Sequence, residues 1–365
     1  MRKFSVSFFS FILSILCLNS LVAQNIPTKE LAYKVFTLSE IKRPTSVKVL
    51  PAFNLLIVTD GSAGLNEPTL YAYTLDSIKF IKSFITVGEG SDQVNTPGAV
   101  QYFAGERVIR MFDVNMQRFC EIPIDAILKK GGQVPIARYL GRDSLTKKIR
   151  FNNFALKAPY VLPKGKEMIE LNNLLNAPFQ FLLKDEAGSK TDPSIFKVLS
   201  NTGVLKSEYG RLPQEIVEEV EKSAINRFAG VLDMNDRGDI AIYRSYFANF
   251  IALYNLKGKL LAYRYGTPDN DGPNDKQSLF IGETNWAYLS VVARMHKDQV
   301  YAINFHPKNG VGEDGKKRLN LYVFDKALKP QKRLVIRGGE ISFDVNPETG
   351  CIYSLDNQQL YVSFQ

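Results

Sequence analysis

Residues 45–84 contain four short strand-like segments in succession: TSVKVL (45–50), LLIVTD (55–60), LYAYTLD (70–76) and FIKSF (80–84). Each segment is rich in β-branched and aromatic residues, and turn-forming residues such as Pro51, Asn54 and Gly61 lie between them. Runs of this length and composition, separated by turn residues, predict β-strands joined as hairpins. Four short antiparallel strands in succession form one blade of a β-propeller.

The same unit recurs along the chain. A second copy spans residues 99–140, a fourth spans 228–265 and a fifth spans 289–336. One anchor residue is placed in the second strand of every unit: Leu56, Val108, Phe179, Ile240, Val300 and Ile352. Six units of similar length predict an all-β fold, a six-bladed propeller. The strands between Arg142 and Phe179 are hard to phase, so a seventh blade stays open as an alternative.

The sixth unit contains only three strand-like runs, at residues 341–345, 351–355 and 360–364. A further strand-like run, LAYKVFTL at residues 31–38, belongs to no unit. We therefore predict that this N-terminal strand completes the sixth blade and closes the ring. Closure removes an open pairing edge that would otherwise invite aggregation.

Residues 1–23 have the features of a secretory signal peptide. Arg2 and Lys3 precede an almost wholly apolar run, and a stretch that includes small residues ends at Ala23. We predict cleavage after Ala23, which leaves residues 24–365 as a single propeller domain. The exported protein is expected in the periplasm or at the cell surface.

Membrane attachment is not predicted. The apolar run is shorter than the ~20 residues that cross a bilayer, and no later segment reaches that length, so we expect no transmembrane segment. Cys17 is preceded by the bulky Leu16 rather than by a small residue, which argues against a lipid anchor at that cysteine.

The formal net charge of the chain is +9, and it becomes about +7 when Arg2 and Lys3 leave with a leader that holds no acid. The excess occurs as scattered pairs such as Lys129-Lys130, which are typical of solvated loops. Nucleic-acid binding needs basic residues gathered on one face, so we expect no nucleic-acid partner. Cys120 and Cys351 lie inside strand-like runs and are predicted to be buried thiols.

Residues 212–222 break the strand pattern. Pro213 suits a first helical turn, acidic residues follow it, and Ile216, Val217 and Val220 share one face. We predict one short amphipathic helix inserted between blades three and four. It is interpreted as a lid packed on its own propeller, with a partner-docking helix as the alternative.

The layout resembles the TolB-like six-bladed propellers of exported and lipidated bacterial proteins. The resemblance covers nearly the whole mature chain and is carried by the blade rhythm and the glycine-rich link VGEGS at residues 87–91, with PGAVQYF at 97–103. Residues 266–273 look like a second such link. The family is largely without assigned activity, so the resemblance implies a fold and a compartment.

No catalytic residue is predicted. The chain holds two histidines, His296 and His306, and neither lies in a recognisable nucleophile or metal motif. The densest polar run is DNDGPND at residues 269–275, where Asp269, Asp271 and Asp275 suggest a calcium site, with an ordinary turn as the alternative. No other cofactor is expected.

Aromatic and polar residues beside the strands of blades four and five are the candidate binding residues. Arg244, Tyr246, Trp286 and Tyr288 are suited to stacking on a sugar or peptide, or alternatively to packing between blades. The leading hypothesis is a monomeric binding or scaffolding module of the cell envelope, with a protein, peptide or glycan as partner.

The alternative function is a propeller-type enzyme, such as a lyase, a lactonase or a glycoside-active protein. Such enzymes place several His, Asp or Glu residues around the ring axis. Three or more converging carboxylates, or a histidine cluster, would favour the enzyme. A smooth, aromatic and weakly charged face would favour binding.

Overall fold

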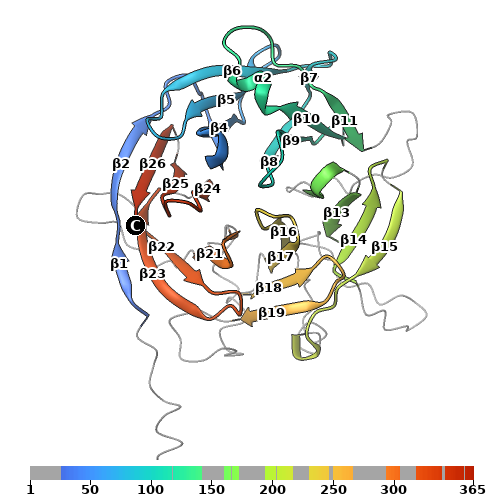
Figure 1. Ribbon diagram of the computed structural model, residues 1–365, viewed down its shortest axis with the longest axis vertical. Coiled ribbons are helices and arrows are strands. Elements are labelled where there is room, and N and C mark those ends of the chain that lie inside the picture. The colour runs from blue at the N-terminus through green and yellow to red at the C-terminus, as the bar shows by residue number, and fades with distance from the viewer. Residues whose placement is uncertain are drawn as a thin grey trace, which may run out of the picture.

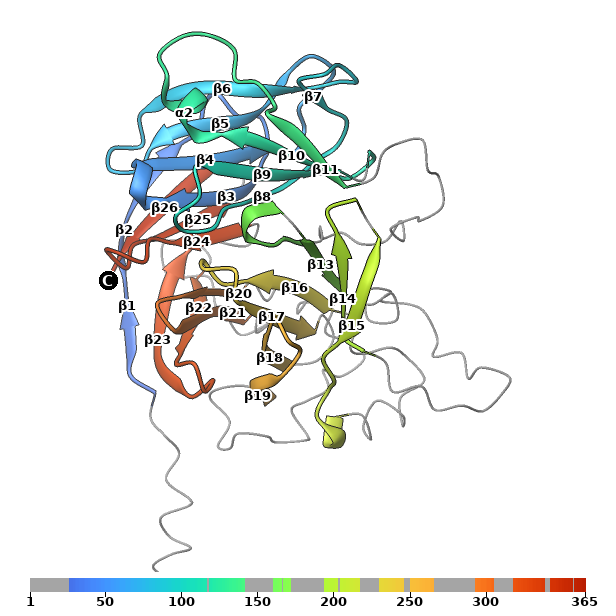
Figure 2. The same cartoon turned by 45° about the vertical axis from the view of Figure 1, so that its right-hand side comes forward.

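The computed structural model describes residues 26–116, 118–141, 160–165, 167–171, 194–202, 204–216, 230–245, 250–265, 293–304, 318–338, 342–356 and 358–365. Their strands form six sheets that are arranged as a ring of blades (Figure 1). Figure 2 shows the ring tilted, with neighbouring sheets fanned around a common centre. The predicted six-bladed propeller is confirmed.

The first three blades follow the chain in order. Blade one contains β3 (Pro44–Leu50), β4 (Leu55–Asp60), β5 (Pro68–Thr74), β6 (Phe80–Val87) and β7 (Gln93–Val94). Blade two contains β8 (Pro97–Gln101), β9 (Val108–Asp113), β10 (Arg118–Pro123) and β11 (Arg138–Gly141). Blade three contains β12 (Tyr160–Val161), β13 (Glu167–Leu171), β14 (Phe196–Ser200) and β15 (Leu205–Tyr209). The four segments expected for blade one and the span 99–140 expected for blade two coincide closely with these strands.

The other three blades include both N-terminal strands. Blade four contains β16 (Gly230–Met234), β17 (Ile240–Ser245), β18 (Phe250–Asn255) and β19 (Leu260–Tyr265). Blade five contains β20 (Ala293–His296), β21 (Gln299–Asn304), β22 (Arg318–Phe324), β23 (Pro330–Arg337) and β1 (Thr28–Glu30). Blade six contains β24 (Ser342–Val345), β25 (Ile352–Asp356), β26 (Gln359–Phe364) and β2 (Ala32–Thr37).

The N-terminal segment closes the ring as predicted. Strand β2 pairs antiparallel with β26, from Ala32 opposite Phe364 to Thr37 opposite Gln359. Strand β1 was not predicted, and it pairs in parallel with β23 on the neighbouring blade. The segment therefore fastens to blades five and six together.

Blade three corrects one prediction. Its second strand is β13, at residues 167–171, whereas the anchor Phe179 was placed further along the chain and lies outside the described residues. The run FQFLL at 179–183 has the composition of a strand, but the true strand EMIEL carries two glutamates. The anchor was therefore placed in the later run because that run is the more apolar of the two.

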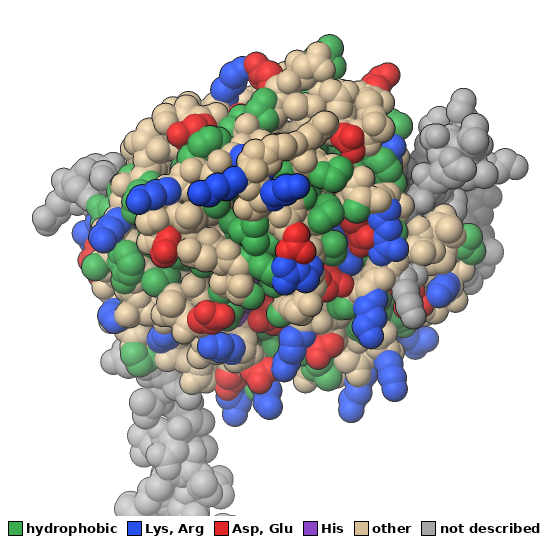
Figure 3. All heavy atoms as spheres, turned by 45° about the horizontal axis from the view of Figure 1, so that its top comes forward, with side chains coloured by type: hydrophobic (Ala, Val, Ile, Leu, Met, Phe, Trp, Pro, Cys, Tyr) green, Lys and Arg blue, Asp and Glu red, His purple; other side chains and the backbone are tan. Residues whose placement is uncertain are grey.

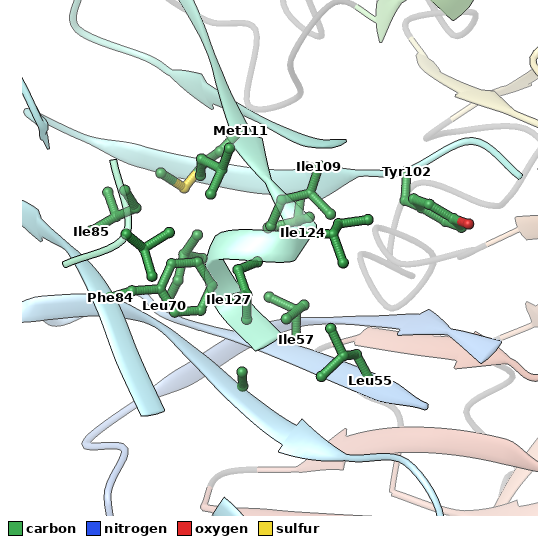
Figure 4. Packing of buried hydrophobic residues seen from close by; sticks show 14 of the residues in the cluster. Leu55, Ile57, Leu70, Phe84, Ile85, Tyr102, Ile109, Met111, Ile124 and Ile127 are labelled. Atoms are coloured by element: carbon green, nitrogen blue, oxygen red, sulfur yellow. The ribbon is translucent and has the colours of Figure 1, made fainter. Parts of the chain in front are cut away.

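The core lies between the blades, because the second strand of a blade packs on both of its faces. All six residues of β4 are buried. Figure 4 shows the packing between blades one and two, where Ile57 and Ile109 lie beside the helix α2 (Ile124–Leu128). This helix carries the buried side chains Ile124 and Ile127 and was not predicted.

The predicted helix at 212–222 is described only at its start. Residues 214–216 are helical, and the remainder lies outside the described residues. Ile216 is buried in the cluster shared by blades three and four, and the Tyr263 hydroxyl donates to Glu215 Oε1 at 2.7 Å. The first turn therefore packs on the propeller itself.

Both described cysteines are free thiols, but only Cys120 is buried; Cys351 is half-buried, which corrects the prediction for that residue. Burial raises the pKa of Cys120 to about 12, with a further contribution from Asp113. Cys351 lies just before β25, where the turn from β24 ends, so solvent reaches it.

The surface shown in Figure 3 carries lysine and arginine side chains interspersed with acidic and apolar ones. This distribution agrees with the scattered basic pairs seen in the sequence. Within the part of the chain that the structure describes, no helix is both long and apolar enough to cross a membrane.

Candidate functional site

The first strand of every blade lies nearest the ring axis, as β8, β16 and β24 show in Figure 1. Each of these six strands carries a polar side chain that is linked to a neighbouring blade. Together with Asp236, which follows β16, these residues form what we call the axial cluster: Lys48, Gln101, Tyr160, Asp233, Asp236, Arg294, His296 and Asp344.

Asp344 on β24 is the centre of this cluster. Its Oδ2 accepts a hydrogen bond from the Val49 backbone N–H at 2.9 Å and lies 3.3 Å from Lys48 Nζ. Its Oδ1 accepts from the Val345 N–H at 3.0 Å and lies 3.2 Å from His296 Nε2. One carboxylate therefore joins the inner strands of blades five, six and one.

Burial alone would raise the pKa of the Asp344 carboxyl, but Lys48, His296 and Arg294 lower it well below its usual range. Because the side chain is 1% exposed, the ionised form depends on these partners rather than on water. Asp344 is therefore a fixed negative charge inside the ring.

A second carboxylate continues the network toward blade three. Asp233 on β16 pairs with the Arg294 guanidinium, and its Oδ1 accepts from the Tyr160 hydroxyl at 2.6 Å and from the Met234 N–H at 2.8 Å. Arg294 Nε also lies 3.9 Å from Asp344 Oδ1. The network thus runs without a break from blade three to blade one.

Blade two joins through an amide. Gln101, at the end of β8, accepts a hydrogen bond from the Val161 N–H at 3.1 Å, so its carbonyl satisfies a buried backbone donor of β12. All six inner strands are therefore linked by side chains. Directional contacts of this kind fix how far each inner strand stands from the next.

His296 lies at the end of β20 between two carboxylates. Its Nε2 is 3.2 Å from Asp344 Oδ1, and its Nδ1 is 3.7 Å from Asp236 Oδ2, which is too long for a hydrogen bond. Burial would lower the pKa of the imidazole, but the two carboxylates outweigh that effect and raise it. Among the described residues, Nδ1 has no hydrogen-bond partner.

The charged residues of the axial cluster differ in their exposure to solvent. The side chains of Lys48, Arg294 and Asp236 are 17%, 18% and 24% exposed, whereas those of Asp233 and Asp344 are 6% and 1% exposed. Solvent thus reaches two cations and one carboxylate, and it scarcely reaches the other two carboxylates. Such a surface offers both donors and acceptors to a polar ligand.

Of the predicted binding residues, the structure places only Arg244. It lies on β17 and is 1% exposed. Burial raises the pKa of the Tyr160 hydroxyl, and the nearby charge of Arg244 partly opposes that rise. Tyr246, Trp286 and Tyr288 lie outside the described residues. A binding role for these four residues stays a prediction.

The predicted calcium ligands Asp269, Asp271 and Asp275 also lie outside the described residues. Within the residues that are described, no group of three or more His, Cys, Asp or Glu side chains is arranged to hold a metal ion. The calcium hypothesis therefore stays a prediction.

Sequence reasoning missed the axial cluster, although a signal for it exists. A single charge stands between apolar residues in Val47-Lys48-Val49, Leu232-Asp233-Met234 and Phe343-Asp344-Val345. Each triplet occupies the first strand of its blade. Charged residues are rarely buried without a partner, so three such triplets at equivalent positions indicate that the charges meet.

No protein-family model matches this chain, and no curated protein matches it. Solved structures do match. A member of the DUF4221 family from Bacteroides vulgatus has a TM-score of 0.57 and 11% identity, covering 92% of this chain and 96% of that one. A Bacteroides fragilis protein inferred to be exported has a TM-score of 0.47 and 10% identity, covering 90% and 87%.

A third match is a Bacteroides fragilis protein inferred to be a 6-phosphogluconolactonase, with a TM-score of 0.41 and 11% identity, covering 85% of this chain and 76% of that one. At such identities similarity shows the fold alone. The molecule is a six-bladed β-propeller protein. The Bacteroides vulgatus structure shares that architecture over nearly its whole length.

Proposed function

We propose that the protein is a binding module of the bacterial cell envelope that recognises its ligand at the axial cluster. The observation that carries this proposal is the convergence of polar side chains from all six inner strands, with Lys48, Arg294 and Asp236 partly exposed to solvent. Ligand sites need a few precisely placed polar groups on a rigid frame.

The internal bonding of the cluster favours recognition over catalysis. Asp344 and Asp233 are each held by a backbone N–H and by side-chain donors, so neither is poised to exchange a proton with a ligand. His296 is flanked by carboxylates that raise its pKa, which disfavours a role as general base near neutral pH. A prearranged set of donors and acceptors is what a binding site requires.

One observation favours an enzyme as the second candidate. The carboxylates of Asp236 and Asp344 flank His296, and Arg294 links Asp233 to Asp344. Converging carboxylates of this kind are what a propeller-type enzyme places around the ring axis. A protonated His296 would serve as a general acid in a lyase, lactonase or glycoside-active protein. The axial cluster would then be an active site.

The compartment is part of the same proposal. Residues 1–23 act as an export signal, cleavage after Ala23 releases a monomer to the periplasm or the cell surface, and Cys17 carries no lipid. The ligand is then an envelope protein, peptide or glycan. Membership of the TolB-like propellers is proposed from the blade rhythm and the glycine-rich link at 87–91.

The test is an array of envelope glycans and peptides probed with the wild type, with Asp236→Asn and with Asp76→Asn. Asp236 is a partly exposed member of the cluster, whereas Asp76 is exposed on the outer turn between β5 and β6. We expect a ligand whose affinity falls about 10-fold in Asp236→Asn and stays unchanged in Asp76→Asn.

The same array, monitored for products, separates the two candidate functions. If a lactone or glycan is turned over by the wild type but not by His296→Gln, the protein is an enzyme rather than a binding module. Ligands that bind both aspartate variants as they bind the wild type would place recognition away from the axial cluster.

A further inference from the structure

We propose that the axial cluster takes a sugar acid, whose carboxylate is held by Lys48 and Arg294 and whose hydroxyls donate to Asp236. The inference rests on the proposed binding function and names its ligand class. Three features of the cluster carry it: the donors left on Lys48, the different exposures of the charged side chains, and the Nδ1 of His296, which is unpartnered among the described residues.

The Lys48 ammonium has hydrogen-bond donors that a ligand can use. It carries three N–H groups. Among the described residues its ion-pair contact is Asp344 Oδ2 at 3.3 Å, on an oxygen that already accepts from the Val49 N–H at 2.9 Å. The Lys48 side chain is partly exposed to solvent. An incoming carboxylate can therefore accept from Lys48 without displacing the contacts that hold Asp344.

The charges of the cluster differ in their exposure to solvent. The side chains of Asp233 and Asp344 are 6% and 1% exposed, against 18% for Arg294, 17% for Lys48 and 24% for Asp236. A ligand approaching from solvent therefore meets two cations and one carboxylate. Arginine recognises planar carboxylates, and a neighbouring lysine adds a point charge. Because the partly exposed cations outnumber the partly exposed carboxylate, the cluster favours a ligand that carries a negative charge.

The third partly exposed charge is the Asp236 carboxylate, and it requires donors from the ligand. Its Oδ2 lies 3.7 Å from His296 Nδ1, and that buried nitrogen has no hydrogen-bond partner among the described residues. A hydroxyl placed beside both atoms would donate to Asp236 and accept from a hydrogen on Nδ1. A carboxylate alone would be repelled by Asp236.

A carboxylate and hydroxyl groups are therefore needed on one small ligand. Neutral sugars supply the hydroxyls without the charge, and acetate supplies the charge without the hydroxyls. Sugar acids such as galacturonate and glucuronate combine both, and their rigid rings fix the distance between the two kinds of group. Rigid ligands lose little conformational entropy on binding.

The experiment is calorimetric titration of the purified protein with galacturonate and glucuronate, each beside its neutral parent, galactose or glucose, and beside acetate. We expect at least one acid to bind, with its parent and acetate at least about 10-fold weaker. Lys48→Met is expected to lose about 10-fold or more in affinity, and Lys48→Arg to recover most of it.

The matched control is Lys79→Met, because Lys79 is an exposed lysine on the outer turn before β6. It is expected to bind as the wild type does. Circular dichroism and thermal melting of all three lysine variants show whether each is folded, and Lys48→Arg keeps the test informative if Lys48→Met unfolds.

Three results would overturn the proposal: no binding of either acid at millimolar concentration, equal binding of acid and neutral parent, or unchanged affinity in folded Lys48→Met. A neutral glycan or a peptide that binds and is weakened by Asp236→Asn would end the acid proposal but keep the axial cluster as the binding site. Absence of any ligand dependent on the cluster would end the proposed function as well.

Discussion

Two junctions of the ring are built differently. Between blades one and two, buried apolar side chains such as Ile57, Ile109 and Ile127 fill the space (Figure 4). Between blades six and one, an apolar cluster is also present, but polar side chains of β24 are added near the axis. Ser342 Oγ accepts from the Val47 N–H at 3.3 Å, and Asp344 Oδ2 accepts from the Val49 N–H at 2.9 Å.

The difference follows from the position of the two junctions in the chain. Blades one and two are consecutive, so the linking segment limits how they can pack. Blades six and one meet across 295 residues of sequence, and apolar burial alone is not directional. Hydrogen bonds from β3 to β24, together with the pairing of β2 on β26, specify the register where the ring closes.

Removing the closing strand has the largest expected effect. Deletion of residues 26–37 removes the six-residue ladder between β2 and β26 and exposes the edge of β26. We expect a loss of about 5 kcal/mol or more in the free energy of unfolding, since each ladder hydrogen bond contributes roughly 1 kcal/mol and the open edge invites aggregation. Urea unfolding and light scattering measure both effects.

Deletion of residues 26–30 alone is the matched control. It removes β1, whose three residues are all exposed and which lies on blade five, but it leaves the closing ladder intact. We expect a loss of about 1–2 kcal/mol. Equal losses from the two deletions would contradict the view that β2 is the strand that closes the ring.

The next largest effect is expected at the polar part of the closing junction. Asp344→Ala leaves the Val49 and Val345 N–H groups without their acceptor and removes the partner of Lys48 and His296. Removing one partner of a buried ion pair costs about 3–5 kcal/mol, and chemical unfolding measures the loss. A change below about 1 kcal/mol would show that the axial carboxylate does not help to hold the ring.

The apolar junction should be less sensitive to a single substitution. Ile127→Ala removes part of a fully buried side chain between blades one and two, and we expect a loss of about 2–4 kcal/mol. No titratable group is involved in this substitution, so the loss should be the same at pH 6 and pH 8. A loss that changes with pH would contradict the division of the two junctions into apolar and charged types.

Most of the fold could be predicted from the sequence, because the rhythm of strands and turns repeats. Blades one, two and four show it most clearly, and the unpaired run at 31–38 indicated the closing strand. Three features escaped, and the first is β1, which spans only three exposed residues. The glutamates of β13 weaken its strand signal, and α2 spans only five residues, which is too short to show helical periodicity.

The candidate site was much harder to predict. Its residues come from six strands that are far apart in sequence, and only the closed ring brings them together. Arg244 was named as a candidate binding residue with packing between blades as the alternative, and it lies buried on the second strand of blade four. His296 was set aside because no motif surrounds it, and its partner Asp344 is 48 residues away. A site built from distant strands leaves only a weak signal in the sequence, which is a single charged residue inside an apolar strand.

The smallest expected effect concerns the pH dependence of the closing junction. His296 faces the carboxylates of Asp236 and Asp344, and Lys48 and Arg294 lie near Asp344 as well. Burial would lower the pKa of His296, but the two carboxylates raise it. Its stabilising contribution is therefore fully present below the unfolded value of about 6.5 and is lost as the pH rises through the folded pKa. As the pH rises above 6.5, we expect the free energy of unfolding of the wild type to fall by about 1 kcal/mol more than that of His296→Gln.

Melting temperatures of the two proteins, measured from pH 5.5 to pH 9, check this expectation. His296→Gln keeps a polar side chain of similar length but cannot be protonated, so its curve should lie below that of the wild type at low pH and approach it at high pH. Ile127→Ala should lie below the wild type by a constant amount. Parallel curves for His296→Gln and the wild type would show that the imidazole has the same charge in the folded and unfolded chains, and that the charged junction gains nothing from protonation.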